Sequence, residues 1–450
     1  MSNSPKGGLF TDLYELTMAQ AYLEHDIRAE AQFEVFFRRM EGRNFYLAAG
    51  LESVLDSLEG FGYTSADLDY LHSTGRFSDD LLDYLRGLRF TGSVEAMPEG
   101  TAVFPMEPLL RVRGPMIEAQ LVETLVLNQV HFQTLAASKA ARMALAARGL
   151  PVLDFGARRA HGCDAALGVA RAGWIGGLAG SSLVEAGRRY GIQVSGTMAH
   201  SYIQAHEDEL EALRRFQQTF PETILLVDTY DTIEGVRQVI ELARELGESF
   251  RVQGIRLDSG DLLELSRQAR EMLDEAGLKH LKILASGGLG EHQIEELLGK
   301  GAPLDGFGVG TKLAVSRDVP AIDIAYKLVD YAGEPRTKFS ARKAIYPGPK
   351  QVFRRMDGGV MVGDVLATAG DRLDGEPLLH PVMSNGSRLD AGRESLDAMR
   401  ERARKSIETL PERLRKLETA EPPYPVEPSE LLREVMESLR RKSDASATSL

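Results

Sequence analysis

The chain has 450 residues, of which 43% are hydrophobic and 26% are charged, and its formal net charge at pH 7 is −13. Such a composition predicts a globular protein with a large buried core, in two or three domains or one large barrel with an appended domain. The negative charge argues against nucleic acid as the main partner, because phosphate-backbone binding needs a basic surface. The single cysteine, Cys163, excludes an internal disulfide framework and a cysteine-rich metal site.

The sequence contains no apolar run long enough to span a membrane, and its first twenty residues lack the apolar segment of an export signal. We therefore expect a cytoplasmic protein.

The first part of the chain, 1–116, is predicted to form a mixed α+β domain. Residues 9–27 have an amphipathic helical pattern, and residues 31–40 read as a strand that runs into paired arginines. Residues 93–116 contain short apolar runs interrupted by proline and glycine, which favours an antiparallel hairpin.

Residues 117–315 are predicted to form an α/β domain. The pattern is helical up to Arg148 and then alternates between strand, loop and helix. Strands are predicted at 151–156, 191–196, 223–228, 254–258, 281–286 and 306–310. Parallel strands joined by helices predict a doubly wound sheet or a βα barrel.

The rest of the chain changes character again. Residues 316–385 are strand-rich and are predicted to return to the first domain. Residues 386–441 are predicted to be C-terminal helices interrupted by a proline-rich connector, and the polar segment 442–450 is predicted to be a disordered tail.

Polar or glycine residues stand at the carboxyl ends of the six predicted strands. In parallel α/β folds ligands bind at these ends. The residues concerned are Phe155 and Arg158; Thr197 and His200; Asp228 and Asp231; Arg256, Asp258 and Asp261; Ser286, Gly287 and Gly288; and Gly308, Gly310 and Thr311. Six such ends together favour a single polar site.

The residue types at these ends suggest an anionic ligand. The turns "ASGGLGEH" and "GFGVGTK" suit phosphate groups, because glycine lets backbone N–H groups approach an anion; tight βα turns are the alternative. The acidic segments "LLVDTYD" and "GIRLDSGD" suit Mg²⁺ or a ribose diol, or helix capping by Asp231 and Ser259. Neither a G-x-G-x-x-G fingerprint nor a P-loop is present. His200 is either a structural imidazole or an active-site residue.

Eight segments in order resemble the nicotinate phosphoribosyltransferase family. They are "TDLYELTMAQAY", "FGARRAHG", "GTMAHSYIQ", "LLVDTYDT", "IRLDSGDL", "ASGGL", "GVGTKLAVS" and "KFSARKAIYPGPKQVFRR", and they cover about residues 9 to 355. The resemblance implies a type II phosphoribosyltransferase, an irregular α/β barrel with an N-terminal mixed α+β domain. It also implies a homodimer whose active sites form between subunits.

The resemblance implies an enzyme that joins nicotinate to phosphoribosyl pyrophosphate (PRPP), giving nicotinate mononucleotide and pyrophosphate in NAD salvage. It further implies a ligase-type reaction that needs Mg²⁺ and is coupled to hydrolysis of ATP through phosphorylation of His200.

The resemblance also implies a role for each site residue. Phe155 stacks on the pyridine ring with Tyr14 of the partner subunit, while Arg158 binds the carboxylate and Arg256 orients the substrate. Asp228 and Asp258 meet ribose hydroxyls or Mg²⁺. The residues expected to bind PRPP phosphates are Thr197, Ser286, Gly287, Gly288, Gly308, Gly310 and Thr311, with Arg38, Lys338 and Ser340 at the pyrophosphate end.

Ser182 is expected to select the acid over the amide. Related nicotinamide-using enzymes carry an aspartate at the position that aligns with Ser182; here a serine can donate to the nicotinate carboxylate, which a buried aspartate would repel. The alternatives are a nicotinamide or quinolinate phosphoribosyltransferase, and a non-catalytic paralogue that binds pyridine or PRPP.

Overall fold

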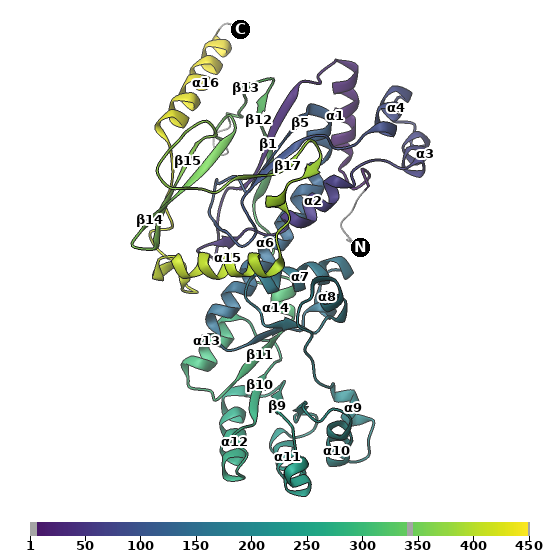
Figure 1. Ribbon diagram of the computed structural model, residues 1–450, viewed down its shortest axis with the longest axis vertical. Helices are drawn as coiled ribbons and strands as arrows, with labels where there is room; N and C mark the ends of the chain where they lie inside the picture. The colour runs from purple at the N-terminus through teal and green to yellow at the C-terminus, as the bar shows by residue number, and fades with distance from the viewer. Residues whose placement is uncertain (1–6, 340–344, 449–450) are drawn as a thin grey trace. The chain divides into compact units, whose positions relative to one another are not determined.

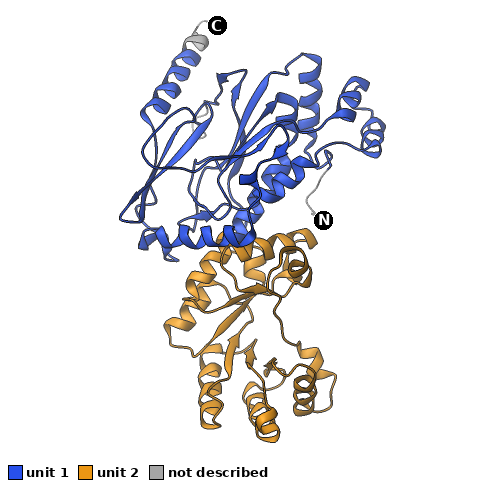
Figure 2. Cartoon of the chain, viewed as in Figure 1, with its two compact units in different colours: residues 1–137, 319–450 blue, residues 138–318 orange. Residues whose placement is uncertain are grey.

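The computed structural model describes residues 7–339 and 345–448. The chain divides into two compact units (Figure 2): unit 1 comprises residues 1–137 and 319–450, and unit 2 comprises residues 138–318. The first boundary lies inside the long helix α6 (Glu123–Ala146), whereas the sequence pattern placed it before that helix, at residue 117. A continuous helix leaves no break in the sequence pattern by which to find such a boundary.

The larger sheet of unit 1 combines strands from both ends of the chain (Figure 1). Its order is β13 (Glu334–Pro335), β12 (Ile324–Tyr331), β1 (Glu30–Phe37), β5 (Leu110–Pro115), β3 (Ser93–Ala96), β17 (His380–Ser384) and β18 (Ser387–Arg388). The central strand β1 pairs antiparallel with both β5 and β12. Phe33, Val35 and Phe37 of β1 are buried in the core of the unit.

The rest of unit 1 consists of short strands and helices. A second sheet has the order β16 (Glu376–Pro377), β14 (Lys350–Asp357), β15 (Val360–Thr368) and β19 (Val426–Pro428), and β2 (Tyr46–Leu47) pairs with β4 (Ala102–Val103). The helices are α1 (Leu13–Glu24), α2 (Leu51–Glu59), α3 (Ser65–Ser73), α4 (Asp79–Gly87), α5 (Met116–Leu121), the first part of α6, α15 (Leu396–Thr409) and α16 (Glu430–Thr448), with 3₁₀ turns at Asp390–Gly392 and Glu412–Arg415.

Helix α16 continues to Thr448 and so corrects the expectation of a disordered tail over 442–448, while 449–450 lie outside the described residues. Extending an existing helix adds one hydrogen bond for each residue fixed, so a polar segment can remain helical once the helix has started. No helix in the described ranges combines the length and the apolar character needed to cross a lipid bilayer.

Unit 2 is built on a curled parallel sheet, and this half-barrel confirms the predicted α/β barrel class. The strand order is β7 (Gly180–Ser181), β6 (Val152–Asp154), β11 (Gly306–Val309), β10 (Lys282–Ala285), β9 (Gly254–Leu257) and β8 (Ile224–Leu226). The helices are α7 (Cys163–Ile175), α8 (Val184–Tyr190), α9 (His200–Gln204), α10 (Glu209–Thr219), α11 (Thr232–Leu246), α12 (Leu262–Glu275), α13 (Glu291–Gly299) and α14 (Thr311–Ala314), with 3₁₀ turns η1 (Ala157–Arg159) and η2 (Gly247–Ser249).

The predicted strand at 191–196 is wrong, and the short strand β7 was missed. The backbone of Ser181 donates to the carbonyl of Gln193 at 3.0 Å and accepts from the N–H of Ser195 at 3.0 Å. Because both bonds converge on one residue, the segment forms only an isolated bridge between Ser181 and Val194.

The two helices that follow β8 and β9 begin with aspartate caps. The side chain of Asp231 accepts from the N–H of Glu234 at 2.8 Å and caps α11. Helix α12 is capped by Asp261 rather than by Ser259, since Asp261 accepts from the N–H groups of Leu263 and Glu264.

Candidate active site

The carboxyl ends of β6, β11, β10 and β9 lie next to one another along one edge of the parallel sheet. Figure 1 labels β11, β10 and β9 of this sheet. Strands that pair in parallel end at the same edge, so the residues that follow them are brought together. The predicted residues on or directly after these strands are Phe155, Gly308, Gly310, Thr311, Ser286, Gly287, Gly288, Arg256 and Asp258.

Arg256, on β9, contacts several of these residues. Its Nη1 donates to Oδ1 of Asp258 at 3.4 Å and to Oγ of Ser286 at 3.3 Å, and its Nη2 donates to the carbonyl of Met198 at 2.8 Å. The guanidinium carbon lies 6.0 Å from the centre of the Phe155 ring. Burial lowers the pKa of Arg256, but a guanidinium stays charged in proteins. The edge therefore holds a permanent, largely buried positive charge beside an aromatic ring.

Asp228 and Asp258 form a connected acidic pair. Oδ2 of Asp228 accepts from the N–H of Asp258 at 2.9 Å and from the hydroxyl of Ser259 at 2.6 Å. The hydroxyl of Ser286 donates to Oδ1 of Asp258. Oδ1 of Asp228 is buried and accepts no hydrogen bond from the described residues. A buried carboxylate oxygen without a partner is costly, so this position suits a ligand hydroxyl or a cation.

His200 is the first residue of α9 and faces this acidic pair. Its Nδ1 lies 3.1 Å from Oγ1 of Thr229, and its Nε2 lies 3.9 Å from Oδ2 of Asp258. The side chain is 41% exposed. The structure thus brings His200 into the cluster and leaves its ring accessible to a ligand.

Phe155 packs directly on the backbone of β11. A Cβ atom at Gly308 would lie 2.3 Å from Cε2 of Phe155 and 3.2 Å from Cβ of Ser286. Any larger residue at Gly308 would therefore displace the ring. Arg158, in η1, is exposed and close enough to Arg256 for their charges to repel.

The turn after β10 requires glycine. Gly287 has φ of +90°, and a Cβ there would lie 1.9 Å from the carbonyl oxygen of Asp258. Gly288 has φ of +66°, with no atom within 4 Å of an added Cβ. After β11, Gly310 precedes α14, which begins at Thr311. Both glycine turns lie at the predicted edge of the sheet.

Ser182 and Thr197 lie on segments that adjoin this edge. The N–H of Ser182 donates to the carbonyl of Asp154 at 2.8 Å, next to Phe155. Thr197 precedes Met198, whose carbonyl accepts from Arg256. Both the serine and the threonine are partly buried.

The remaining predicted residues belong to unit 1 or lie outside the described residues. Tyr14, on α1, is 45% exposed; its pKa is raised by partial burial and by the nearby Glu123. Nη1 of Arg38 donates to Oδ1 of Asp323 at 2.8 Å, so its charge is already paired. Lys338 is exposed, and Ser340 lies outside the described residues.

Sequence reasoning missed Asp154, Ser181 and Thr229. Asp154 and Ser181 are buried at the ends of β6 and β7 and share a hydrogen bond of 2.7 Å. A carboxylate within the apolar segment "PVLDFG" was the available signal, because a buried acid needs partners. Thr229 gave no signal of its own, since its role depends on contact with His200.

The described residues hold no group of three or more His, Cys, Asp or Glu side chains arranged as a metal site. Mg²⁺, however, often binds one or two carboxylates together with waters and substrate phosphates. The unpartnered Oδ1 of Asp228, beside Asp258, fits that mode of binding.

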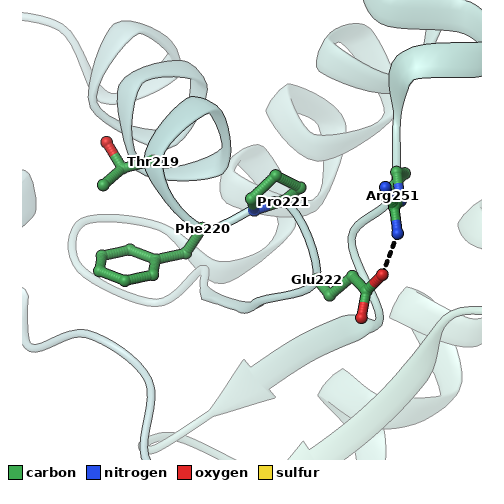
Figure 3. A pocket seen from close by; sticks show the side chains of 5 residues that line it. All are labelled: Thr219, Phe220, Pro221, Glu222 and Arg251. Carbon is green, nitrogen blue, oxygen red and sulfur yellow. Dashed lines mark hydrogen bonds and ion pairs between the residues drawn. The ribbon is translucent and has the colours of Figure 1, made fainter.

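A surface pocket of about 420 Å³ lies at the opposite end of the strands (Figure 3). Its lining comes from residues that precede β8 and β9: Thr219, Phe220, Pro221, Glu222 and Arg251. Glu222 and Arg251 form an ion pair across it. None of the predicted site residues lines this pocket, so the chemistry is concentrated at the other edge of the sheet.

A curled parallel sheet with an arginine, two hydrogen-bonded aspartates and glycine turns at its carboxyl edge defines a protein of the α/β-barrel class. Three models of the nicotinate phosphoribosyltransferase (NAPRTase) family match the chain: the N-terminal domain at residues 9–131, the family model at 150–347 and the C-terminal domain at 367–436. The chain belongs to the nicotinate phosphoribosyltransferase family.

Similar proteins agree with this assignment. The chain is 53% identical over 442 residues to nicotinate phosphoribosyltransferase pncB2 of Mycobacterium tuberculosis, covering 98% of this chain and 96% of that protein. It is 44% identical to nicotinate phosphoribosyltransferase of Bacillus subtilis, over 83% of this chain and 79% of the other.

Solved structures are similar as well. The crystal structure of human nicotinic acid phosphoribosyltransferase has a TM-score of 0.85 at 29% identity, covering 95% of this chain and 99% of that one. Nicotinate-nucleotide pyrophosphorylase from Pyrococcus furiosus has a TM-score of 0.74 at 26% identity, covering 89% and 95%.

Proposed function

We propose that this protein is a nicotinate phosphoribosyltransferase, which transfers phosphoribosyl from PRPP to nicotinate in NAD salvage and releases pyrophosphate. The observation that carries the proposal is the position of Arg256, which lies 6.0 Å from the Phe155 ring and donates to Asp258. An aromatic face and a cation suit a flat carboxylated ring, and an adjacent carboxylate suits a sugar. Family membership and the names of the relatives support the same substrate.

The reaction itself needs no general base. The pyridine nitrogen is unprotonated near neutral pH, so its lone pair can attack the anomeric carbon of PRPP while the bond to pyrophosphate breaks. Phe155 stacks on the ring, and Arg158 and Arg256 bind or orient the carboxylate. Protein groups that stabilise developing charge then supply most of the catalysis.

The acidic pair and the glycine turns act on the phosphoribosyl group. Asp228 and Asp258 bind ribose hydroxyls or hold Mg²⁺, and their negative charge favours the oxocarbenium-like transition state. Mg²⁺ held by these carboxylates would supply positive charge to neutralise the departing pyrophosphate. The PRPP phosphates bind at Thr197 and at the glycine turns that include Ser286 and Thr311.

His200 couples the reaction to ATP. A ring nitrogen attacks the γ-phosphorus, the bond between that phosphorus and its bridging oxygen breaks, and ADP leaves. Hydrolysis of the phosphohistidine then restores the imidazole. The half-exposed ring beside the acidic pair supports this role. A phosphoryl group adds about 1.5 to 2 negative charges and can change the balance between conformations.

We also propose the assembly that the family resemblance implies. We place the enzyme in the cytoplasm as a homodimer, with Tyr14 supplied to the site of the other subunit. Arg38, Lys338 and Ser340 bind the pyrophosphate end of PRPP. Arg38 would have to exchange Asp323 for pyrophosphate, because the two now form an ion pair.

The test is an assay of the purified protein with nicotinate, PRPP and Mg²⁺, with and without ATP. We expect nicotinate mononucleotide to form, and ATP to increase its yield or rate. Nicotinamide and quinolinate serve as competing substrates. Formation of nicotinamide mononucleotide in preference to the acid product, or PRPP binding without turnover, would reject the proposal.

A further inference from the structure

A buried hydrogen-bond chain connects the ends of β6 and β7. Asp154 is 1% exposed, and its Oδ1 accepts from the N–H of Gly156 at 2.7 Å. Its Oδ2 accepts from the hydroxyl of Ser181 at 2.7 Å. The same hydroxyl oxygen accepts from the N–H of Leu183 at 3.1 Å. The side chains of Asp154 and Ser181 thus connect the backbone after β6, at Gly156, with the backbone after β7, at Leu183.

This chain brackets two residues assigned to nicotinate. The hydrogen bond from the N–H of Gly156 to Asp154 forms a short turn with Phe155 at its centre. The bond from the N–H of Leu183 to Ser181 forms a similar turn with Ser182 at its centre. The N–H of Ser182 also donates to the carbonyl of Asp154 at 2.8 Å. The ring that stacks on the pyridine and the serine that meets its carboxylate are therefore held by one network.

We infer that Asp154 and Ser181 form a positioning pair that sets the affinity for nicotinate by fixing Phe155 and Ser182 relative to each other. Both side chains are buried, so we assign them a positioning role and no contact with the substrate. The inference rests on the proposed function, since it assumes that Phe155 and Ser182 meet nicotinate.

The cost of the arrangement favours a role beyond stability. Burial raises the pKa of Asp154, and the donors Ser181 and Gly156 oppose this shift. A buried carboxylate is expensive, whereas an apolar pair could join two strands without that cost. Strand β7 is only two residues long and lies at the end of the sheet, where backbone bonds to Gln193, Ser195 and Asp154 hold its main chain and the Asp154–Ser181 bond is the side-chain link to β6.

The test compares Asp154→Asn, Ser181→Ala and the double variant with the wild type. The first change can turn an N–H₂ group toward the hydroxyl of Ser181, and the second removes that hydroxyl. We measure the KM for nicotinate and for PRPP, the binding of nicotinate by calorimetry, and the Tm. A hydrogen bond to a charged group is worth enough to expect about a tenfold rise in the Kd and KM for nicotinate in each single variant.

The expected pattern has three further parts. The KM for PRPP changes by less than about twofold, the double variant is no worse than the more impaired single variant because the pair is coupled, and Ser181→Thr, which keeps the hydroxyl, restores binding. Thr91→Val is the matched control: the Thr91 hydroxyl donates to the buried Glu118 at 2.9 Å in unit 1. It should lower the Tm and leave the nicotinate Kd unchanged.

Two outcomes would overturn the inference. One is a lower Tm with an unchanged Kd for nicotinate, and the other is an equal rise in the KM for nicotinate and the KM for PRPP. Calorimetry on the wild-type protein distinguishes failure of this inference from failure of the proposed function. A wild-type protein that binds nicotinate but transfers nothing contradicts the function alone, whereas one that binds no nicotinate contradicts both.

Discussion

Nδ1 of His200 lies 3.1 Å from the hydroxyl oxygen of Thr229, while Nε2 lies 3.9 Å from Oδ2 of Asp258. The threonine comes from the loop after β8 and the aspartate from the end of β9, so two neighbouring strand ends orient one imidazole. A hydrogen bond at one ring nitrogen influences the protonation and direction of the other.

His200→Asn tests the coupling to ATP. We expect the variant to retain slow, ATP-independent formation of nicotinate mononucleotide, because the transfer needs no base, and to lose ATP hydrolysis coupled to product formation. Measuring ADP and product in the same reaction checks this. Survival of the ATP stimulation would show that another residue accepts the phosphoryl group.

Ser182→Asp tests the choice between acid and amide. A carboxylate at this position repels nicotinate and can accept from the amide of nicotinamide, so we expect the ratio of kcat/KM values to move toward nicotinamide by about tenfold or more. Competition kinetics with both pyridines measure the ratio. Ser182→Asn, which adds bulk without charge, is the control, and an unchanged ratio in Ser182→Asp would exclude this role.

Gly287→Ala and Gly288→Ala separate steric conflict from backbone strain. Both glycines have positive φ, so either alanine should cost about 1–2 kcal/mol. Only Gly287 meets the carbonyl of Asp258, at 1.9 Å from an added Cβ. We expect Gly287→Ala to lower the free energy of unfolding by at least about 1 kcal/mol more than Gly288→Ala. Equal denaturation midpoints would contradict this account of the turn.

Glu209 makes stability depend on pH. Burial and the nearby Asp208 raise its pKa from 4.5 to about 7, and its Oε1 has no hydrogen-bond partner in the described residues. Between about pH 4.5 and about pH 7, Glu209 of the folded protein keeps a proton that the unfolded chain has already released. The contribution of Glu209 to the free energy of unfolding therefore falls as pH rises from about 4.5 to about 7 and then levels off.

Glu209→Gln removes this titration. The Tm of the variant minus the Tm of the wild type should therefore increase as the pH is raised from 5 to about 7.5, by an amount that corresponds to about 1–3 kcal/mol in the free energy of unfolding. Glu211→Gln is the control. Hydrogen bonds from Arg215 and Arg214 lower the pKa of Glu211. Its contribution to the free energy of unfolding is therefore constant between about pH 5 and pH 7.5 and is lost only as the pH falls below the usual pKa of a glutamate. A constant Tm difference for Glu209→Gln would refute the raised pKa.

Much of the site could be predicted because its chemistry is carried by local sequence. The glycine turns after β10 and β11 follow short apolar runs, and parallel strands necessarily bring their carboxyl ends to one edge. The same local pattern failed at 191–196, where an apolar run forms a single bridge because its hydrogen bonds converge on Ser181.

The sequence by itself determined the family, the α/β barrel class and the residue types at the strand ends, since these depend on periodicity and on ordered motifs. Only the tertiary structure decided that the first unit boundary lies inside α6, that Thr229 faces His200, and that Asp154 is bonded to Ser181. Asp154 and Ser181 are 27 residues apart in sequence. Their contact depends on strand order and side-chain direction, which no local pattern encodes.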